Sequence, residues 1–114
     1  MTLPRPNVSV IVPCYNEEAT IRWLLEALYQ QSYPRDEIEV IISDGMSTDC
    51  TRQEINSFQL NHPGYALRII DNPDRAIPSG LNRAIQAARG EYIVRLDAHS
   101  IPYPDYIENC IRDL

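Results

Sequence analysis

The chain has 114 residues, of which 44% are hydrophobic, so it is long enough for one globular unit but short for a complete α/β enzyme. Its formal net charge of -6 argues against binding to nucleic acid or to an anionic membrane surface. All ten basic residues are arginine, which excludes the lysine of a phosphate-binding P-loop.

The cysteines and the N-terminus bear on the cellular compartment. Cys14, Cys50 and Cys110 are odd in number and far apart, which favours neither a disulfide framework nor a zinc site. Residues 1–5 lack the apolar core of a signal peptide, and no stretch approaches the roughly 20 apolar residues that span a bilayer. We therefore expect a cytoplasmic protein, whose full-length form can associate with the cytoplasmic face of a membrane.

The first predicted unit is a strand followed by a helix. Residues 1–7 form an extended lead-in, and the β-branched run 8–13 is typical of a central parallel strand that ends at Pro13. A helix is expected to open at residues 14–18, with Asn16 as its N-cap and acids in its first turn. Its apolar stripe consists of Ile21, Leu24, Leu25 and Leu28.

The rest of the chain alternates strands with helices. The expected strands are 38–43, 66–70 and 92–96. A weaker helix over 50–61 turns Ile55 and Phe58 inward. The next helix begins near Pro78, carries a stripe of Leu81, Ala84, Ile85 and Ala88, and ends at Gly90 as the residue after its C-cap.

This alternation predicts an α/β fold with three layers, in which a mostly parallel sheet lies between helices. A last helix is expected from Pro104, with Ile107, Cys110, Ile111 and Leu114 at helical spacing, and it has no stop signal. We therefore interpret residues 1–114 as a single but truncated domain, the N-terminal part of a longer one.

Polar loops follow three of the strands and are expected at one edge of the sheet, where α/β proteins bind ligands. They are residues 15–17, 44–49 and 97–99. Asp97 and His99 are two residues apart on an extended segment, so both point the same way and can share a divalent cation. Taken alone, an Asp after a strand more often forms a turn or caps a helix. The four glycines form neither a dinucleotide-binding nor a P-loop pattern.

Three blocks of the sequence, in this order, resemble the inverting glycosyltransferases of family 2, which have the GT-A fold. They are Val8-Ser9-Val10-Ile11-Val12-Pro13-Cys14-Tyr15-Asn16-Glu17, Ser43-Asp44-Gly45-Met46-Ser47-Thr48-Asp49-Cys50-Thr51, and Gly90-Glu91-Tyr92-Ile93-Val94-Arg95-Leu96-Asp97-Ala98-His99. The sequence around Asp97 is most similar to that of succinoglycan-type exopolysaccharide glucosyltransferases. The resemblance implies that the chain is the nucleotide-binding half of such an enzyme.

The resemblance also implies a donor site for a nucleotide sugar, expected to be a UDP-sugar. It places Pro13, Tyr15 and Glu17 around the base, and Asp44 as a hydrogen-bond acceptor for it. The other interpretation of Asp44 is a loop residue that binds local backbone amides. Arg75 and Asn82 are expected near the nucleotide, where an arginine can pair with phosphate or stack on the base. Ser47 and Asp49 are interpreted as loop and cap residues.

Asp97-Ala98-His99 occupies the place of the family's D-x-D motif. The resemblance implies that Asp97 meets the ribose or the metal and that His99 helps to ligate Mn²⁺ or Mg²⁺ at the sugar diphosphate. His99 departs from the usual acid, and imidazole favours Mn²⁺ at least as much as Mg²⁺. A hydrogen bond to the diphosphate, or a plain turn, are the other interpretations of His99.

The catalytic base is expected beyond Leu114, so residues 1–114 alone should bind donor but transfer sugar poorly to a glycan or lipid-linked acceptor. A noncatalytic nucleotide-binding or interaction module of the same fold is the alternative, and a nucleotidyltransferase is a third. An uncovered sheet edge or helix face would also permit a homodimer of this fragment.

Overall fold

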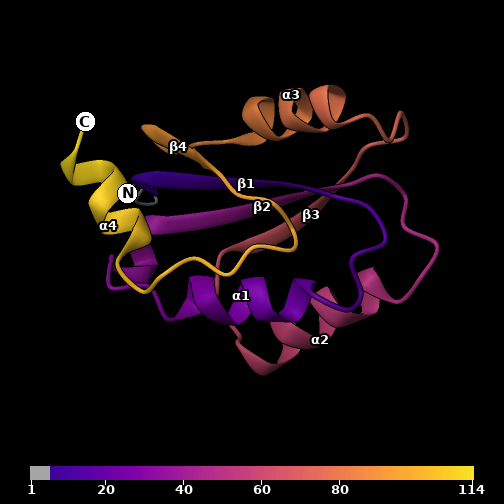
Figure 1. Cartoon of the computed structure of the whole chain (residues 1–114), viewed down its shortest axis with the longest axis horizontal. Helices are drawn as coiled ribbons and strands as arrows, with labels where there is room; N and C mark the ends of the chain where they lie inside the picture. Colours follow the sequence, from indigo (N-terminus) through magenta and orange to yellow (C-terminus); the bar gives the residue numbers. More distant parts are fainter. Residues whose placement is uncertain (1–5) are drawn as a thin grey trace.

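The computed structural model describes residues 6–114, so most of the lead-in predicted over residues 1–7 lies outside the described residues. The elements follow one another as a strand-helix alternation (Figure 1). They are β1 (Val8–Cys14), α1 (Ile21–Tyr29), a short 3₁₀ helix (Arg35–Glu37), β2 (Ile38–Asp44), α2 (Thr51–Asn61), β3 (Leu67–Asp71), α3 (Ile77–Ala87), β4 (Tyr92–Arg95) and α4 (Tyr106–Arg112).

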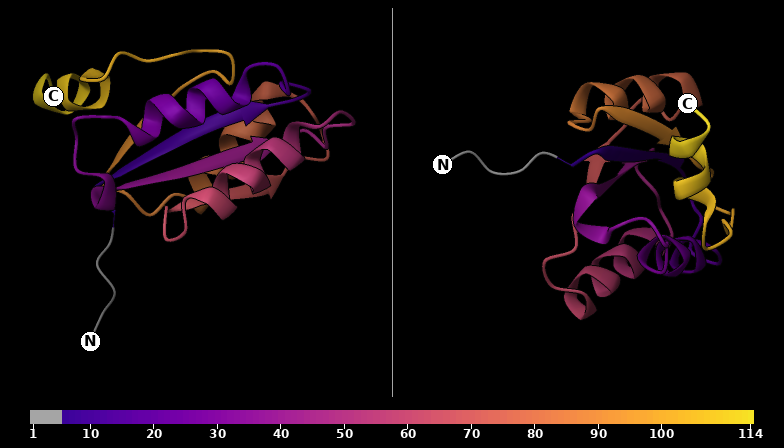
Figure 2. Two further views of the ribbon diagram at one scale, coloured as in Figure 1. Left: turned by 90° about the horizontal axis from the view of Figure 1, so that it is seen from below. Right: turned by 90° about the vertical axis from the view of Figure 1, so that its left-hand side faces the viewer.

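The described residues form one parallel sheet in the order β3-β2-β1-β4. Helices α1 and α2 cover one face of this sheet and α3 covers the other, whereas α4 lies at the end where the strands begin (Figures 1 and 2). The predicted three-layer α/β architecture is therefore confirmed. Among the described residues, no helix is both long enough and apolar enough to cross a membrane.

The core forms on both faces of β1 and β2, as their continuous apolar runs predicted. On the α1 and α2 face, alternate strand residues pack against the predicted helix stripes. This cluster includes Val8, Val10, Val12, Ile38, Val40 and Ile42 from the strands and Ile21, Leu24, Leu25, Leu28, Ile55 and Phe58 from the helices. Full burial of each such large side chain stabilises the fold by about 1.5–3 kcal/mol.

Pro13 lies inside β1, which we expected to end there. The carbonyl of Cys14 accepts a hydrogen bond from Gly45 N on the β2 side, at 2.8 Å. Because backbone groups of successive residues face opposite neighbours, the nitrogen of Pro13 faces β4. The pairing of β4 with β1 ends at Ile11 and Arg95, before Pro13 is reached. The missing N–H therefore breaks no ladder hydrogen bond, and the strand continues to Cys14.

The expected start of the first helix was wrong. Helix α1 begins at Ile21, its N-cap position is Thr20, and its first turn carries no acid. Asn16 instead has a φ of 50° and turns its amide toward the loop after β2. Its Oδ1 accepts hydrogen bonds from the backbone of Thr48 at 2.8 Å and of Asp49 at 3.3 Å. Asn16 thus joins two loops rather than capping a helix.

The stripe on α3 was only partly right. Ala84 is buried and Leu81, Ala87 and Ala88 pack beside it, but Ile85 is 46% exposed. The helix ends at Ala87, so Gly90 is not the residue that follows its C-cap. A Cβ on Gly90 would lie 2.7 Å from both the backbone nitrogen and Oγ of Ser9. The glycine is needed because the chain passes this close to β1.

We expect Gly90→Ala to destabilise the protein by about 1–3 kcal/mol, the usual cost of overpacking a filled site. The new methyl group would meet the backbone of Ser9 and, at 2.8 Å, the carbonyl carbon of Val8, and neither can rotate away. Urea unfolding followed by circular dichroism measures the change. Ser57→Ala, at an exposed position on α2, is the control and should stay within about 0.5 kcal/mol. Equal midpoints for the two variants would contradict the packing argument.

The last helix begins two residues later than Pro104, at Tyr106. Ile107 is buried, and Cys110 and Ile111 pack partly against the core, but Leu114 is 78% exposed. Strand β4 forms one edge of the described sheet. The expected homodimer through such an edge remains a prediction, and sedimentation analysis of the chain tests it.

Candidate functional site

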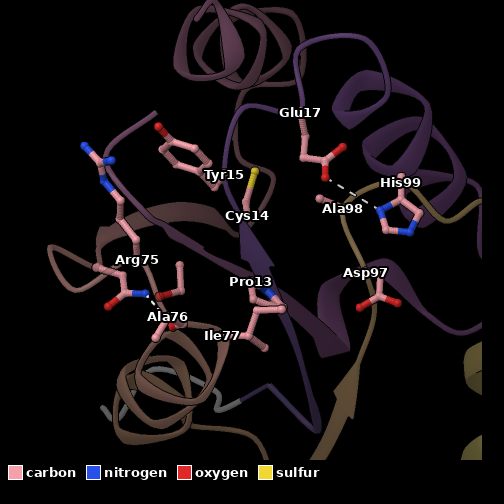
Figure 3. A pocket seen from close by; sticks show the side chains of 12 residues that line it. Pro13, Cys14, Tyr15, Glu17, Arg75, Ala76, Ile77, Asp97, Ala98 and His99 are labelled. Carbon is pink, nitrogen blue, oxygen red and sulfur yellow. Dashed lines mark hydrogen bonds and ion pairs between the residues drawn. The ribbon is translucent and has the colours of Figure 1, made fainter. Parts of the chain in front are cut away.

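A pocket of about 230 Å³ opens beyond the carboxyl ends of the strands (Figure 3). From β1 the chain builds outward through β2 to β3, and then returns to place β4 on the other side of β1. Such a reversal of strand order creates a crevice in which α/β proteins bind ligands. The pocket is lined by Pro13, Cys14, Tyr15, Glu17, Ser43, Asn72, Arg75, Ala76, Ile77, Asp97, Ala98 and His99.

One side of the pocket combines an aromatic ring with an arginine. The Arg75 guanidinium carbon lies 5.1 Å from the centroid of the Tyr15 ring, a cation–π arrangement. Arg75 has a φ of 62°, which turns the loop after β3 back toward β1. Gly45 permits this approach, because a Cβ there would lie 3.3 Å from both Arg75 Cα and the Tyr15 ring. A ring and a guanidinium offer flat surfaces and a positive charge to a ligand.

The other side carries Asp97 and His99. Both side chains line the pocket, as does the buried Ala98 between them. The expected extended segment is instead a turn, because the carbonyl of Asp97 accepts hydrogen bonds from Ser100 N at 3.0 Å and from Ser100 Oγ at 2.6 Å. Asp97 lies 3.6 Å from Arg95, and His99 Nδ1 lies 3.6 Å from Glu17 Oε1. The Asp97 and His99 side chains are 53% and 66% exposed, so both remain open to a ligand.

The Asp97 and His99 side chains suit a cation whose remaining coordination positions are filled by a bound ligand. Across residues 6–114, no cluster of three or more His, Cys, Asp or Glu side chains could hold a metal ion by itself. Mg²⁺ in nucleotide sites is commonly bound by one or two carboxylates together with substrate phosphates and water. Asp97 and His99 supply an oxygen and a nitrogen donor on one pocket wall, which fits Mn²⁺ or Mg²⁺ in this shared form.

Asp44 does not line the pocket. Its side chain is fully buried, and its carboxylate accepts hydrogen bonds from Ser47 N at 2.9 Å and Ser47 Oγ at 2.5 Å. The Arg52 guanidinium completes the set at 2.7 Å and also contacts Asp71 at 2.6 Å. The geometry thus favours the local loop role, and the base contact of Asp44 remains a prediction. The hydrogen bonds of Ser47 fit its interpretation as a loop residue.

Two other residues that were predicted to contact the nucleotide lie in different positions from those expected. Asn82 is exposed on α3 and is not among the pocket-lining residues. Glu17 does line the pocket, but it lies beside His99 and away from Arg75 (Figure 3). The geometry therefore places Glu17 with the Asp97 and His99 side rather than with a base near Tyr15.

Ser43 and Asn72 line the pocket and were missed from the sequence. Asn72 is 2% exposed, donates to the carbonyl of Ala76 at 3.0 Å and accepts from Ser79 Oγ at 3.1 Å. The Ser43 hydroxyl is buried without a hydrogen-bond partner among the described residues. Asn72-Pro73 indicates a turn, and Ser43 sits in an apolar strand run, so neither pattern pointed to a ligand.

Cys14 lines the pocket, but its thiol is held neutral. Burial, reinforced by the negative charges of Asp44 and Glu17, raises the pKa of the Cys14 thiol to about 12. The thiolate is the reactive form, so we expect Cys14 to alkylate far more slowly at pH 8 than the exposed Cys50. Mass spectrometry after a timed iodoacetamide pulse checks this. Labelling in urea is the control, since unfolding should equalise the two rates; equal rates in the native protein would contradict it.

A family model described as glycosyl transferase family 2 matches residues 9–114. The chain belongs to this family. The resemblance found in the three sequence blocks is thereby confirmed. Among curated relatives, the succinoglycan biosynthesis protein ExoA of Rhizobium meliloti (strain 1021) is 34% identical over 106 residues, covering 91% of this chain and 31% of the relative.

Solved structures of glycosyltransferases have the same fold as this chain. The mannosyltransferase PcManGT from Pyrobaculum calidifontis, in complex with GDP-Man and Mn²⁺, superposes with a TM-score of 0.88 at 38% identity and covers 96% of this chain. TarS 1-349 of S. aureus, in complex with UDP, gives a TM-score of 0.83 at 28% identity and covers 93%. The predicted GT-A fold is therefore confirmed.

The match is confined to one part of these proteins. The chain spans 31% of ExoA, 32% of the PcManGT chain and 31% of the TarS chain, about a third in each case. The PcManGT and TarS structures each contain a nucleotide.

Proposed function

We propose that the chain is the donor-binding part of an inverting, metal-assisted glycosyltransferase that takes sugar from a nucleotide diphosphate. The observation that carries this proposal is the pocket at the reversal of strand order, with Tyr15 and Arg75 on one side and Asp97 and His99 on the other. One side suits a base, and the other suits a divalent cation that is bound to a diphosphate. Family membership and the nucleotide-bound neighbours support it.

Each side has a separate task in this proposal. Tyr15 offers its ring to the base, and Arg75 stacks beside it or pairs with a phosphate. Asp97 and His99 hold the cation at the diphosphate. A divalent cation there supplies Lewis-acid stabilisation of the negative charge that develops on the leaving diphosphate. Cys14, Ala76 and Ile77 contribute apolar surface to the pocket.

Transfer with inversion requires a base within hydrogen-bond reach of the acceptor hydroxyl. Asp97 and His99 are assigned to the donor in this proposal and Glu17 lies against His99, so we propose that the base lies in sequence beyond Leu114. The chain spans about a third of its relatives, which leaves room for such a residue. We therefore expect residues 1–114 to bind the donor without efficient transfer, and measurable turnover of a nucleotide sugar would refute this.

The base of the donor has two candidates. UDP follows from the sequence resemblance and from the UDP complex of TarS. GDP is favoured by the complex of PcManGT with GDP-Man and Mn²⁺, which has the higher identity of the two. Ser47 and Arg52 occupy the Asp44 carboxylate that was expected to select uracil, so GDP remains a candidate beside UDP.

The acceptor is proposed to be a glycan or a lipid-linked sugar, in keeping with the similarity to the succinoglycan biosynthesis protein ExoA. All three cysteines are free, which fits the cytoplasm proposed from the sequence. Membrane association would then belong to the full-length protein.

Calorimetry with UDP and GDP, each with Mn²⁺ and with EDTA, tests the proposal on the chain as it is. Binding that strengthens with Mn²⁺ is expected, and the tighter nucleotide identifies the base. Binding that ignores the metal would instead favour the noncatalytic module of the same fold. Arg75→Ala should weaken the binding of both nucleotides. Arg83→Ala, at an exposed position on α3, is the matched control.

A further inference from the structure

Glu17 is fixed in place by contacts to its backbone and to one of its two carboxylate oxygens. Its backbone nitrogen donates to Thr51 Oγ1 at 2.8 Å, and its carbonyl accepts from Thr20 N at 3.1 Å and Ile21 N at 2.9 Å. Its Oε2 accepts from Thr20 Oγ1 at 3.0 Å. One carboxylate oxygen is therefore engaged in the scaffold, and the other is left to face the pocket.

The free oxygen, Glu17 Oε1, lies 3.6 Å from Nδ1 of His99. The two segments also lie close together, since Thr20 Oγ1, whose one proton Glu17 Oε2 accepts, is 3.3 Å from the carbonyl oxygen of Ala98. The His99 ring is exposed, so a small rotation converts this ion-pair distance into a hydrogen bond. In Figure 3 the imidazole lies between Glu17 and Asp97, with the dashed line running to Glu17.

This geometry has a definite consequence for the imidazole. A carboxylate facing Nδ1 accepts a hydrogen bond from Nδ1–H, and the neutral ring then keeps its lone pair on Nε2. Carboxylates in such a position orient metal-binding histidines and increase the basicity of the ligating nitrogen. We infer that Glu17 is a positioning residue that fixes His99 as an Nε2 donor for the cation. This inference rests on the proposed function.

The competing role for Glu17 is direct ligation of the cation. The two roles differ in what a glutamine can replace. A glutamine carbonyl can still accept from Nδ1–H, so E17Q should preserve the orientation of the ring. A neutral amide oxygen is a much weaker ligand than a carboxylate, so E17Q would lose a direct contact about as completely as E17A.

The first experiment needs no metal and reads the tautomer of the neutral His99 ring by ¹⁵N NMR of the imidazole. The chain has two histidines. His62 is an internal reference, because its Nδ1 lies 2.9 Å from the carbonyl of Phe58, which can only accept. We expect His99 to match His62 as the Nδ1–H tautomer and to shift toward Nε2–H in E17A. A wild-type His99 in the Nε2–H form would overturn the inference.

The second experiment measures Mn²⁺ affinity in the presence of nucleotide, from the EPR signal of free Mn²⁺. E17A should weaken Mn²⁺ binding about 10–100-fold, the usual effect of losing such a partner. E17Q should restore most of the affinity. E18A removes the same charge one residue along, where Glu18 accepts from the backbone of Cys50, and should leave the affinity unchanged.

The outcomes separate the inference from the function on which it rests. Mn²⁺ binding that E17A leaves intact, or that E17Q and E17A reduce equally, would overturn the positioning role while leaving the metal-assisted function standing. A wild-type protein whose nucleotide affinity is the same in Mn²⁺ and in EDTA would overturn the proposed function itself, and the metal-free NMR measurement would still report the Glu17 and His99 contact.

Discussion

Asp97→Ala should reduce nucleotide affinity in Mn²⁺ by about 100-fold, to the level measured in EDTA. A hundredfold loss corresponds to about 2.8 kcal/mol, within the several kcal/mol that a shared cation can supply. Asp97 and His99 are the two side chains proposed to bind the cation. Removal of the Asp97 carboxylate therefore leaves only His99 as a ligand, because Glu17 contacts His99 and not the cation in this assignment. Titration calorimetry with the preferred nucleotide, with Mn²⁺ and with EDTA, gives both affinities.

The fold should survive this substitution. The Asp97 pair with Arg95 spans 3.6 Å between half-exposed side chains, and such surface pairs contribute about 0–1 kcal/mol. Asp74→Ala is the matched control, because Asp74 also lies in a loop and pairs with an exposed arginine, Arg83, but lies outside the pocket-lining set. An Asp97→Ala protein with full Mn²⁺-dependent binding would contradict the metal site.

The sheet could be predicted from the sequence because its signal is local. Runs of β-branched residues in β1 and β2 are buried on both faces, and the apolar spacing of α1 faces the same core. The order of the elements then sets a parallel sheet, since each strand is followed by a helix. These features depend on which side chains are buried, and the spacing of apolar residues along the sequence predicts that burial.

The errors came where a distant segment decides the local backbone. Asparagine is a common N-cap residue, but hydrogen bonds to residues 31 or more positions away hold Asn16 in a left-handed conformation. Gly90 follows a helix as a capping glycine does, but its conformation is dictated by contact with Ser9 on β1. Neither of these contacts can be predicted from the residues adjacent to Asn16 or Gly90 in the sequence.

The pocket shows the same division. Tyr15, Arg75, Asp97 and His99 could be placed together because they follow strands whose ends share one edge. The pairing of Glu17 with His99 could not, because it depends on how the loop before α1 crosses the segment after β4. Asn72 was hidden by its resemblance to an ordinary turn residue. Loop convergence is thus predictable, and the partners inside it are not.

Arg52→Met should destabilise the protein by about 3 kcal/mol. Arg52 is 33% exposed and bridges the fully buried carboxylate of Asp44 to Asp71, which ties the ends of β2 and β3 to α2. Removing one member of a buried ion pair leaves an uncompensated charge, which typically costs about 3–5 kcal/mol, and the partial exposure of Arg52 favours the lower end. Urea unfolding monitored by circular dichroism measures this loss.

Two further variants identify the cause of that loss. Arg22→Met removes an exposed pair with Glu26 on α1 and should cost only about 0.3–0.5 kcal/mol. Adding Asp44→Asn to Arg52→Met should recover part of the stability, because the buried group is then neutral. If Arg52→Met costs no more than Arg22→Met, the hydrogen bonds from Ser47 satisfy Asp44 by themselves. The Asp44 carboxylate would then be free to release the arginine and accept from a base, as the sequence resemblance implied.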